Sequence, residues 1–340
     1  MQRALALARN GNHSTSPNPR VGCVIEHQGR IIGEGWHQKA GLPHAEVVAF
    51  NSVKPEDRGL LNQSRVFVNL EPCSHYGRTP PCADLIIKHR PRQVVVANAD
   101  PNPMVSGRGV RLLQEAGIDV VQGICEAEGR YLNRRFFCFH QNQRPYILLK
   151  WAQTSDGFID KSREVGEKGS IAISSPLAQW HVHKWRSEVG AIVVGRLTAE
   201  NDRPKLSNRL WFGNSPVPIV IDPERKLWDG PLFKAESGTY RFGIHSKPQP
   251  QESEVFEKDI DEDVWLSILN LAFERQWLSI MVEGGAQTLK HLLERDLWDE
   301  ARVLISPKYF GQGLEAPKWQ QKPELVNHIG KDRLEVYFRR

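Results

Sequence analysis

The sequence contains no apolar run close to the roughly 20 residues that a membrane-spanning helix needs, so no such helix is predicted. The apolar stretch near the amino terminus is too short for a signal-peptide core, and no small-residue cleavage pattern follows it. Cysteine is scarce, and the odd number of five argues against a disulfide framework. We therefore expect a cytoplasmic protein with free thiols and no membrane partner.

The sequence also lacks a large excess of positive or of negative charge. The 45 Lys and Arg residues against 40 Asp and Glu residues give a formal net charge of +5, and no long run of one sign occurs. This small excess does not predict a nucleic-acid partner. The apolar share of 40% and the charged share of 25% are typical of a globular protein. The length of 340 residues suggests about two domains.

Helix-like and strand-like segments alternate along the first 125 residues, which predicts a three-layer α/β domain. Residues 138–145 are mostly polar and end in proline, as linkers do. We expect one domain over residues 1–143 and a second α/β domain over residues 144–340. Residues 229–262 are polar and allow no confident assignment of elements.

Residues suited to bind a metal ion occur in the first half. His44 is predicted at the first turn of a helix, Cys73 follows a predicted strand, and Cys82 opens another predicted helix. One imidazole and two thiols are the ligands of an open, tetrahedral Zn²⁺ site that keeps water in the fourth position. A helix start also favours the thiolate form that binds metal. The alternatives are a closed zinc site with His75 as fourth ligand, or two unrelated cysteines and a surface histidine.

Glu46 lies two residues after His44 and is expected to be the reactive group rather than a ligand. Zinc lowers the pKa of its bound water to about 7. A nearby carboxylate can take a proton from that water and return it to a ring nitrogen and to leaving ammonia. Zinc deaminases work in this way, and their usual signature is His-x-Glu followed by Pro-Cys-x-x-Cys. Here the gap between the cysteines is longer.

Several motifs occur together in this chain, from PNPRVGCVI and GLPHAE through LEPCSHYGRTPPC and DPNP to KWAQTSDG and VEGGA. They lie at residues 17–25, 41–46, 70–82, 100–103, 150–157 and 282–286, and residues 186–202 add a helix–strand unit. In these motifs the chain resembles the bifunctional riboflavin-biosynthesis deaminase–reductases over nearly its whole length. The resemblance implies a cytidine-deaminase-like three-layer αβα domain followed by a dihydrofolate-reductase-like α/β domain.

The resemblance also implies the two reactions and their cofactors. The first domain would deaminate 2,5-diamino-6-(5-phosphoribosylamino)pyrimidin-4-one with one Zn²⁺ per subunit. The second domain would use NADPH to convert the ribosyl group of the product to a ribityl chain. The implied partners are a small phosphorylated pyrimidine and further copies of the chain, as a homodimer or homotetramer.

Substrate contacts in the first domain are expected at five residues. His75 and Arg78 lie in the loop between the cysteines and could bind a phosphorylated ribose. The other three match positions that contact base and ribose in the family; they are Asn18, Asp100 and Asn102. A loop-capping role is their alternative, because Asn and Asp beside proline are common in turns.

The second half lacks a complete Gly-x-Gly-x-x-Gly fingerprint, so a conventional dinucleotide fold is not expected. Gly284 and Gly285 follow a predicted strand and open a helix, where backbone N–H groups could hold a phosphate; a simple tight turn is the alternative. The resemblance implies cofactor contacts at Ala152, Ala172, Thr198, Asp202, Gly284, Gly285 and Ala286. It implies substrate contacts at Ser170, Arg186, Leu206, Arg209 and Glu283. Lys150 and Glu283 are the expected catalytic residues beside the reacting sugar carbon.

Three positions depart from the family pattern. Ala172 replaces an aromatic residue, Arg203 replaces the acidic residue or asparagine before Pro204, and Asn69 replaces a threonine. The first two leave open a degenerate reductase domain that serves oligomerisation. A nucleic-acid base deaminase is a further alternative, and it would need a basic groove.

His181 and His183 lie on one predicted helix. They face different sides of it and make a poor pair of metal ligands.

Overall fold

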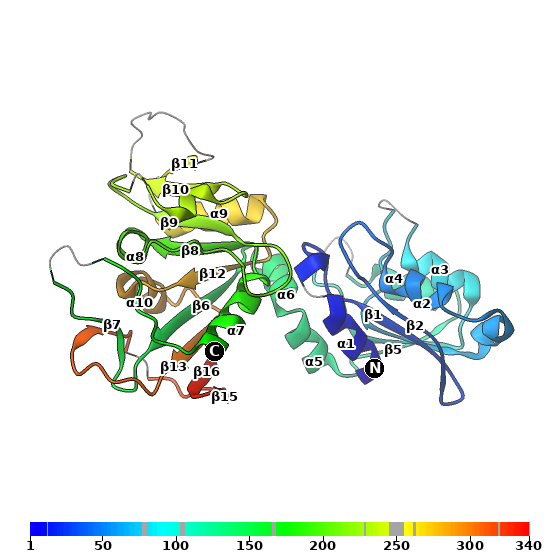
Figure 1. Ribbon diagram of the computed structural model, residues 1–340. Coiled ribbons are helices and arrows are strands. Elements are labelled where there is room, and N and C mark those ends of the chain that lie inside the picture. Colours follow the sequence, from blue (N-terminus) through cyan, green and yellow to red (C-terminus); the bar gives the residue numbers. More distant parts are fainter. Residues whose placement is uncertain are drawn as a thin grey trace. The chain divides into compact units, whose positions relative to one another are not determined.

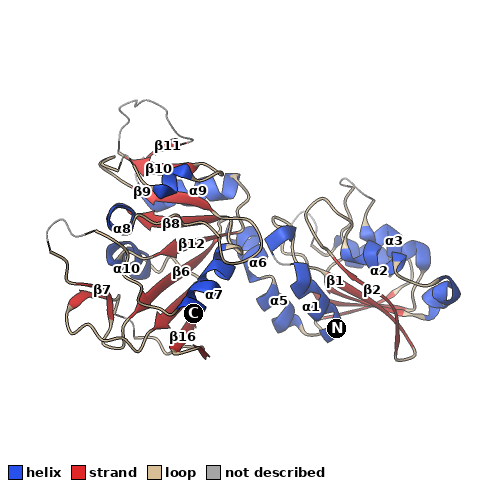
Figure 2. Cartoon of the chain, in the orientation of Figure 1, coloured by secondary structure: helices blue, strands red, loops and turns tan. Residues whose placement is uncertain are grey.

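Two large sheets organise the chain, one in each of two units, Met1–Gln143 and Arg144–Arg340. The computed structural model describes residues 1–11, 13–76, 80–102, 106–164, 168–227, 229–244, 255–260, 263–318 and 320–339. Helices and strands alternate along both units (Figure 1, Figure 2). In the part of the chain that is described, none of the helices has the length and hydropathy of a bilayer-spanning segment.

The first unit contains a five-stranded mixed sheet in the order β2-β1-β3-β4-β5. The pairs β2–β1 and β1–β3 are antiparallel, and the pairs β3–β4 and β4–β5 are parallel. The strands are β1 (Gly22–His27), β2 (Arg30–Trp36), β3 (Arg65–Leu70), β4 (Gln93–Asn98) and β5 (Asp119–Gln122). The helices are α1 (Gln2–Ala8), α2 (Ala45–Asn51), α3 (Cys82–His89), α4 (Arg108–Glu115), α5 (Glu126–Leu132) and α6 (Arg134–Asn142). Short 3₁₀ helices cover Arg9–Gly11, His13–Thr15 and Pro55–Gln63.

Alternation along β1 shows why helices cover both faces of this sheet. Cys23 and Ile25 point into a core that also contains Ala49 of α2 and Ile86 of α3. Val24 points the other way and packs against α1. Successive strand residues face opposite sides, so both faces of β1 are buried. The predicted three-layer architecture is confirmed.

The expected linker at residues 138–145 is wrong in its first part. Helix α6 continues to Asn142, and Gln143 ends it with a left-handed φ of 53°. Phe136, Phe137 and Phe139 are buried, so burial of the apolar side of the helix outweighs the polar composition that suggested a linker.

Cys125 lies between Ile124 and Glu126 in the sequence and is half-buried as the N-cap of α5.

The second unit has a nine-stranded sheet in the order β11-β10-β9-β8-β12-β6-β13-β16-β15, and a two-stranded ribbon β14–β7. The strands from β11 to β13 are parallel, whereas β16 and β15 pair antiparallel. The strands are β6 (Tyr146–Gln153), β7 (Phe158–Lys161), β8 (Ala191–Gly195), β9 (Val217–Ile221), β10 (Thr239–Gly243), β11 (Val255–Asp259), β12 (Ser279–Glu283), β13 (Glu300–Ile305), β14 (Gly313–Glu315), β15 (Leu325–Ile329) and β16 (Asp332–Phe338). The helices are α7 (Pro176–Arg186), α8 (Arg196–Asp202), α9 (Val264–Glu274) and α10 (Ala286–Glu294), with a 3₁₀ turn at Pro231–Lys234.

Both faces of this second sheet are covered by helices. Ile147, Leu149 and Trp151 of β6 pack with α9 and α10. Leu148 points to the opposite face, where α7 and α8 lie. Strands buried on both faces read as nearly continuous apolar runs, which is why β6, β8 and β12 are evident in the sequence.

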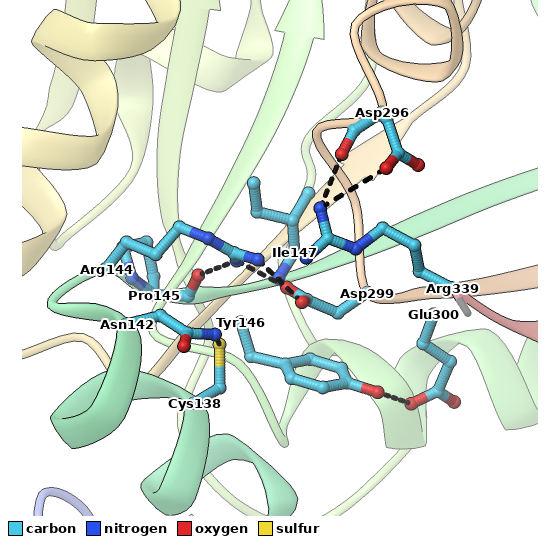
Figure 3. A network of polar contacts seen from close by, with 10 residues as sticks. All are labelled: Cys138, Asn142, Arg144, Pro145, Tyr146, Ile147, Asp296, Asp299, Glu300 and Arg339. Atoms are coloured by element: carbon cyan, nitrogen blue, oxygen red, sulfur yellow. Dashed lines mark hydrogen bonds and ion pairs between the residues drawn. The ribbon is translucent and has the colours of Figure 1, made fainter.

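One ion pair and two further hydrogen bonds hold the beginning of β6 in place. Arg144 donates two hydrogen bonds to the carboxylate of Asp299, at 2.6 and 2.7 Å (Figure 3). The backbone N–H of Ile147 donates to the same carboxylate, at 2.7 Å, and the hydroxyl of Tyr146 donates to Glu300, at 3.1 Å. The first strand of this unit is thereby tied to the start of β13.

The polar segment 229–262 contains the two strands at the edge of the large sheet, β10 and β11. Arg241 of β10 is buried and donates to Glu257 of β11, at 2.9 Å. These paired charges occupy strand positions, and their polarity is what prevented a confident assignment of this segment.

Candidate active sites

The three predicted metal ligands meet at one point of the first unit. His44 is the N-cap of α2, Cys73 lies just beyond β3, and Cys82 is the first residue of α3. The Nδ1 atom of His44 is 3.5 Å from the Cys73 sulfur and 3.4 Å from the Cys82 sulfur. All three donor atoms lie within 4.8 Å of one another, a donor set that fits Zn²⁺. Among the described residues, His75 is not part of this cluster, so the closed site is not supported.

The surroundings of Cys73 favour its thiolate form, which is the form that binds a metal ion. A hydrogen bond with Cys82 and another with His44 outweigh burial and lower the pKa of Cys73 to about 4. The backbone N–H of Cys82, at the start of α3, also donates to the Cys73 sulfur, at 3.3 Å. The Cys73 thiolate, burial and Glu46 in turn raise the pKa of Cys82, so in the metal-free site this thiol keeps the proton that a metal ion would displace.

Glu46 is buried beside the ligand cluster, in the first turn of α2. Burial and, after it, the negative charge of Cys73 raise its pKa to about 7. His44 and Glu46 are only two residues apart, and on a longer stretch of helix such side chains would diverge. At the helix start His44 still has extended backbone, which lets both side chains reach the same point.

Sequence reasoning missed His37, which follows β2 and lies between Asn18 and the metal ligand His44. The Nε2 atom of His37 is 3.1 Å from the amide nitrogen of Asn18, and its Nδ1 atom is 3.1 Å from the carbonyl of Pro43. The rings of His37 and His44 meet edge to face, with centroids 5.5 Å apart. Burial lowers the pKa of His37, so the ring is neutral and its position is fixed by hydrogen bonds.

Glu71 was also missed, although it directly precedes Pro72 and Cys73. It is buried and accepts four backbone N–H groups, from Asp100, Gly107, Gly109 and Val110, at 3.2, 3.0, 2.9 and 3.3 Å. A carboxylate at the start of α4 suits the helix dipole. The segment that carries Asp100 is thereby held against the cysteine loop.

The expected substrate residues of the first unit differ in their surroundings. Burial raises the pKa of Asp100 to about 6, and its carboxylate accepts the N–H of Asn102, at 2.8 Å. That bond is the capping contact that the sequence allowed. His75 is exposed, and Arg78 lies outside the described residues.

The second unit contains a cavity of about 1000 Å³ at the carboxyl ends of its parallel strands. Open parallel sheets bind ligands at this edge. Every residue that was expected to contact cofactor or substrate in this half lines the cavity, together with the expected catalytic pair. They are Lys150, Ala152, Ser170, Ala172, Arg186, Thr198, Asp202, Leu206, Arg209, Glu283, Gly284, Gly285 and Ala286.

Lys150 and Glu283 are both buried, and both line the cavity. They are register partners on the adjacent strands β6 and β12. Arg186 of α7 donates to both carboxylate oxygens of Glu283, at 3.0 and 2.7 Å. Burial alone would raise the pKa of Glu283, but Arg186 and Lys150 lower it to about 2. Burial lowers the pKa of Lys150, and Glu283 partly opposes this.

The glycine turn beside this pair suits a phosphate-bearing cofactor. Gly284 and Gly285 have left-handed φ values of 68° and 72°, which favour glycine, and α10 begins at the next residue. A Cβ atom on Gly285 would lie 3.1 Å from the Thr198 hydroxyl and 3.2 Å from that of Thr288. The backbone of Gly285 therefore lies in a narrow passage beside the hydroxyl groups of Thr198 and Thr288.

Two departures from the family pattern have visible consequences. Ala172 is exposed at the rim, and the ammonium of Lys308 donates to its carbonyl. Arg203 turns outward to the exposed Asp229, at 2.8 Å. The neighbouring Asp202 forms an ion pair with Arg163, at 3.3 Å. Burial raises the pKa of Asp202.

Two protein families match the two units in order. Residues 1–98 match the family described as "Cytidine and deoxycytidylate deaminase zinc-binding region", and residues 145–334 match "RibD C-terminal domain". The "Riboflavin biosynthesis protein RibD" of Aquifex aeolicus is 37% identical over 364 aligned residues, which cover 100% of this chain and 97% of that protein. The protein of that name from Escherichia coli K12 is 35% identical, with 98% and 96% covered.

Solved structures resemble the chain over the same length. "Acinetobacter baumannii RibD, form 2" has a TM-score of 0.86 and 32% identity, and covers 99% of this chain and 97% of its own. A deaminase/reductase structure from Thermotoga maritima has a TM-score of 0.85 and 33% identity, with 99% and 96% covered. The chain therefore belongs to the RibD family of riboflavin biosynthesis proteins, and is a bifunctional enzyme with a zinc-binding deaminase domain followed by a reductase domain.

Proposed function

We propose that residues 1–143 replace the ring amine of 2,5-diamino-6-(5-phosphoribosylamino)pyrimidin-4-one by a carbonyl, and that residues 144–340 reduce the ribosyl group of the product with NADPH. The observation that carries this proposal is the presence of two sites of different chemistry in one chain. One is the His44, Cys73 and Cys82 cluster beside a buried Glu46. The other is a cavity lined by Lys150 and Glu283, which are register partners on adjacent strands.

In the proposed deamination, His44, Cys73 and Cys82 hold the zinc ion. Zinc supplies Lewis acidity, which makes water a competent nucleophile near neutral pH. Glu46 accepts one proton from the attacking water and delivers it to the ring nitrogen. It then carries the second proton, from the newly added hydroxyl, to the amine, which leaves as ammonia while the carbonyl forms. Its burial keeps bulk water from competing for this proton. Asn18, which is held by His37, faces the pyrimidine.

The remaining deaminase contacts are assigned to the ribose and its phosphate. Asp100 and Asn102 bind the ribose hydroxyls, and Glu71 holds their segment in place. His75 and Arg78 lie in the loop between the cysteines and supply cationic and N–H donors to the phosphate.

In the proposed reduction, NADPH supplies a hydride to the sugar carbon that is bonded to nitrogen. The ribose ring must first open to an imine-like form, and the ring oxygen needs a proton as it leaves. Lys150 is a buried ammonium whose pKa is lowered by burial, so it gives up a proton more readily than an ordinary lysine. Glu283 stays ionised beside Arg186 and stabilises the positive charge of the imine.

The other residues of this cavity bind and orient the two reactants. Arg186 and Arg209 hold phosphate or sugar oxygens, and Ser170 and Leu206 complete the substrate side. The N–H groups at the start of α10 bind the cofactor phosphates. Cofactor contacts are assigned to Ala152, Ala172, Thr198, Asp202, Gly284, Gly285 and Ala286.

A two-step assay on the full chain tests the whole proposal. With the diaminopyrimidine phosphate alone, we expect stoichiometric ammonia and no further change. When NADPH is then added, we expect one equivalent of it to be oxidised for each equivalent of ammonia released. Ammonia release without NADPH oxidation would reduce the protein to a deaminase with a degenerate second domain. Deamination of a transfer-RNA substrate in preference to the small molecule would favour the nucleic-acid alternative.

Leucine at Gly285 is expected to weaken NADPH binding about tenfold or more, because a side chain there closes the passage beside Thr198 and prevents close backbone approach. Fluorescence titration of the full chain with NADPH measures the dissociation constant. Gly157→Leu is the matched control, since Gly157 has a similar φ of 88° and open space around it. Equal dissociation constants for the Gly285 variant and this control would remove the glycine turn from the cofactor site.

We also propose a cytoplasmic, homo-oligomeric enzyme. The free thiols of the metal cluster suit a reducing compartment. Light scattering of the purified chain gives the oligomeric state, and a monomeric mass at micromolar concentration would contradict this part of the proposal.

A further inference from the structure

The segment of residues 206–215 lies against α7 and supplies part of the reductase cavity. Leu206 is buried there with a left-handed φ of 56°, and Arg209 lines the cavity beside Arg186. Two side chains on the inner side of α7 bond to the backbone of this segment. Arg186 donates to the carbonyl of Ser207, at 3.2 Å, and His183 accepts the N–H of Arg209 at its Nδ1 atom, at 2.9 Å.

The same segment is also held from the outer side of α7. The ring of Trp211 lies 4.4 Å from that of Trp180, and the ammonium of Lys184 lies 5.3 Å from the Trp211 centroid. Trp180 and Lys184 are one helical turn apart and share a face, whereas His183 and Arg186 share another. The 206–215 segment therefore crosses α7 with contacts on both sides of the crossing.

His183 has the protonation state that its contact requires. It is 2% exposed, and burial, followed by the charges of Arg186 and Arg209, lowers its pKa to about 4. The ring is neutral at physiological pH, and its Nδ1 atom accepts a hydrogen bond, so the single ring proton is on Nε2. A cationic imidazole would present N–H groups on both nitrogens and could not accept the Arg209 N–H.

The guanidinium of Arg209 is held less tightly than the backbone N–H of the same residue. Its Nη1 atom donates a long hydrogen bond, 3.5 Å, to the Ser207 hydroxyl on the exposed side. Of these two contacts, the shorter one holds residue 209 at its backbone N–H rather than at its guanidinium. That backbone is fixed at residue 209 by His183.

We propose that His183 is a positioning residue for the reductase substrate: by accepting the Arg209 N–H, it aims the Arg209 guanidinium at the oxygens of the substrate phosphate or sugar. This inference rests on the proposed function, in which Arg209 binds those oxygens. It assigns His183 no contact with the reacting atoms. The effect of losing His183 should therefore fall on substrate binding and pass through Arg209.

Two substitutions of His183 separate this role from simple packing. Asparagine places its Oδ1 acceptor one bond from Cγ, as Nδ1 is in histidine, whereas leucine fills space without an acceptor. For His183→Leu we expect the KM of the deaminated substrate to rise about tenfold, because the partly buried backbone N–H of Arg209 loses its partner. For His183→Asn we expect a KM within about threefold of the parent chain. Direct titration should give unchanged NADPH dissociation constants for both.

A double-substitution cycle with Arg209→Ala tests the route of the effect. If His183 acts through Arg209, adding His183→Leu to the Arg209→Ala chain should not raise KM further. Additive increases, a His183→Asn chain as impaired as His183→Leu, or weakened NADPH binding would overturn the proposal in favour of a packing role. If His183→Leu does not fold, His183→Asn against His183→Gln decides, because glutamine shifts the acceptor by one bond. Failure of the proposed function itself is separate, since the parent chain would then not reduce the deaminated substrate.

Discussion

Serine in place of Cys82 should remove the zinc ion and deamination together. A hydroxyl is a far poorer ligand for Zn²⁺ than a thiolate, and His44 and Cys73 alone supply too few donors for a tetrahedral site. Elemental analysis should fall from one zinc per subunit to almost none, and ammonia release should fall to background. The reductase should still reduce deaminated substrate that is supplied directly, because its cavity lies in the second unit.

The matched control for this loss is Cys138→Ser. Cys138 is also buried in the first unit, on α6, but it lies outside the metal cluster. This control should keep a full complement of zinc and its deaminase activity, at some cost in thermal stability. Full zinc occupancy in the Cys82→Ser chain would refute the ligand assignment.

Glutamine in place of Glu46 should keep the zinc ion and abolish turnover of the diaminopyrimidine. The amide has the shape of the carboxylate but cannot carry a proton between water, ring nitrogen and leaving amine. General acid–base catalysis contributes about 10²–10⁴-fold, and one group here serves several transfers, so the loss should reach or exceed that range. Steady-state ammonia release measures the rate, and metal analysis verifies that the site is loaded.

Glu26→Gln provides a comparison for the burial of a carboxylate. Glu26 is a mostly buried acid of β1 that pairs with Arg65, at 2.8 Å, and is not part of the metal cluster. Its substitution should lower stability and leave the deamination rate near that of the parent chain. A Glu46→Gln chain that retains deamination within about tenfold of the parent would mean that another group moves the proton.

The metal cluster could be predicted from the sequence because its chemistry is local. His44 and Cys82 each begin a helix, and Cys73 follows a strand, so a few residues on either side determine where each donor points. The residues that support the site could not be found in this way. Glu71 bonds to backbone groups as far along the chain as Val110, and no short pattern encodes those partners.

The elements that were missed share a different cause. The end of α6 and the strands β10 and β11 have polar sequences, and their partners come from tertiary packing rather than local propensity. Phe139 anchors the end of α6, and Arg241 pairs with Glu257 across two strands. The role of His183 was also hidden, because its partner is a backbone N–H 26 residues away.

The place of β6 in the large sheet has a consequence for synthesis on the ribosome. Although β6 is the first strand of its unit, it lies between β12 and β13, which begin at Ser279 and Glu300. Its anchoring bond from Arg144 to Asp299 spans 155 residues. This apolar interior strand therefore stays unpaired until most of the chain has emerged, whereas the first unit can complete its sheet early. We expect nascent chains halted before residue 279 to contain a folded deaminase unit and to depend on chaperones for the remainder.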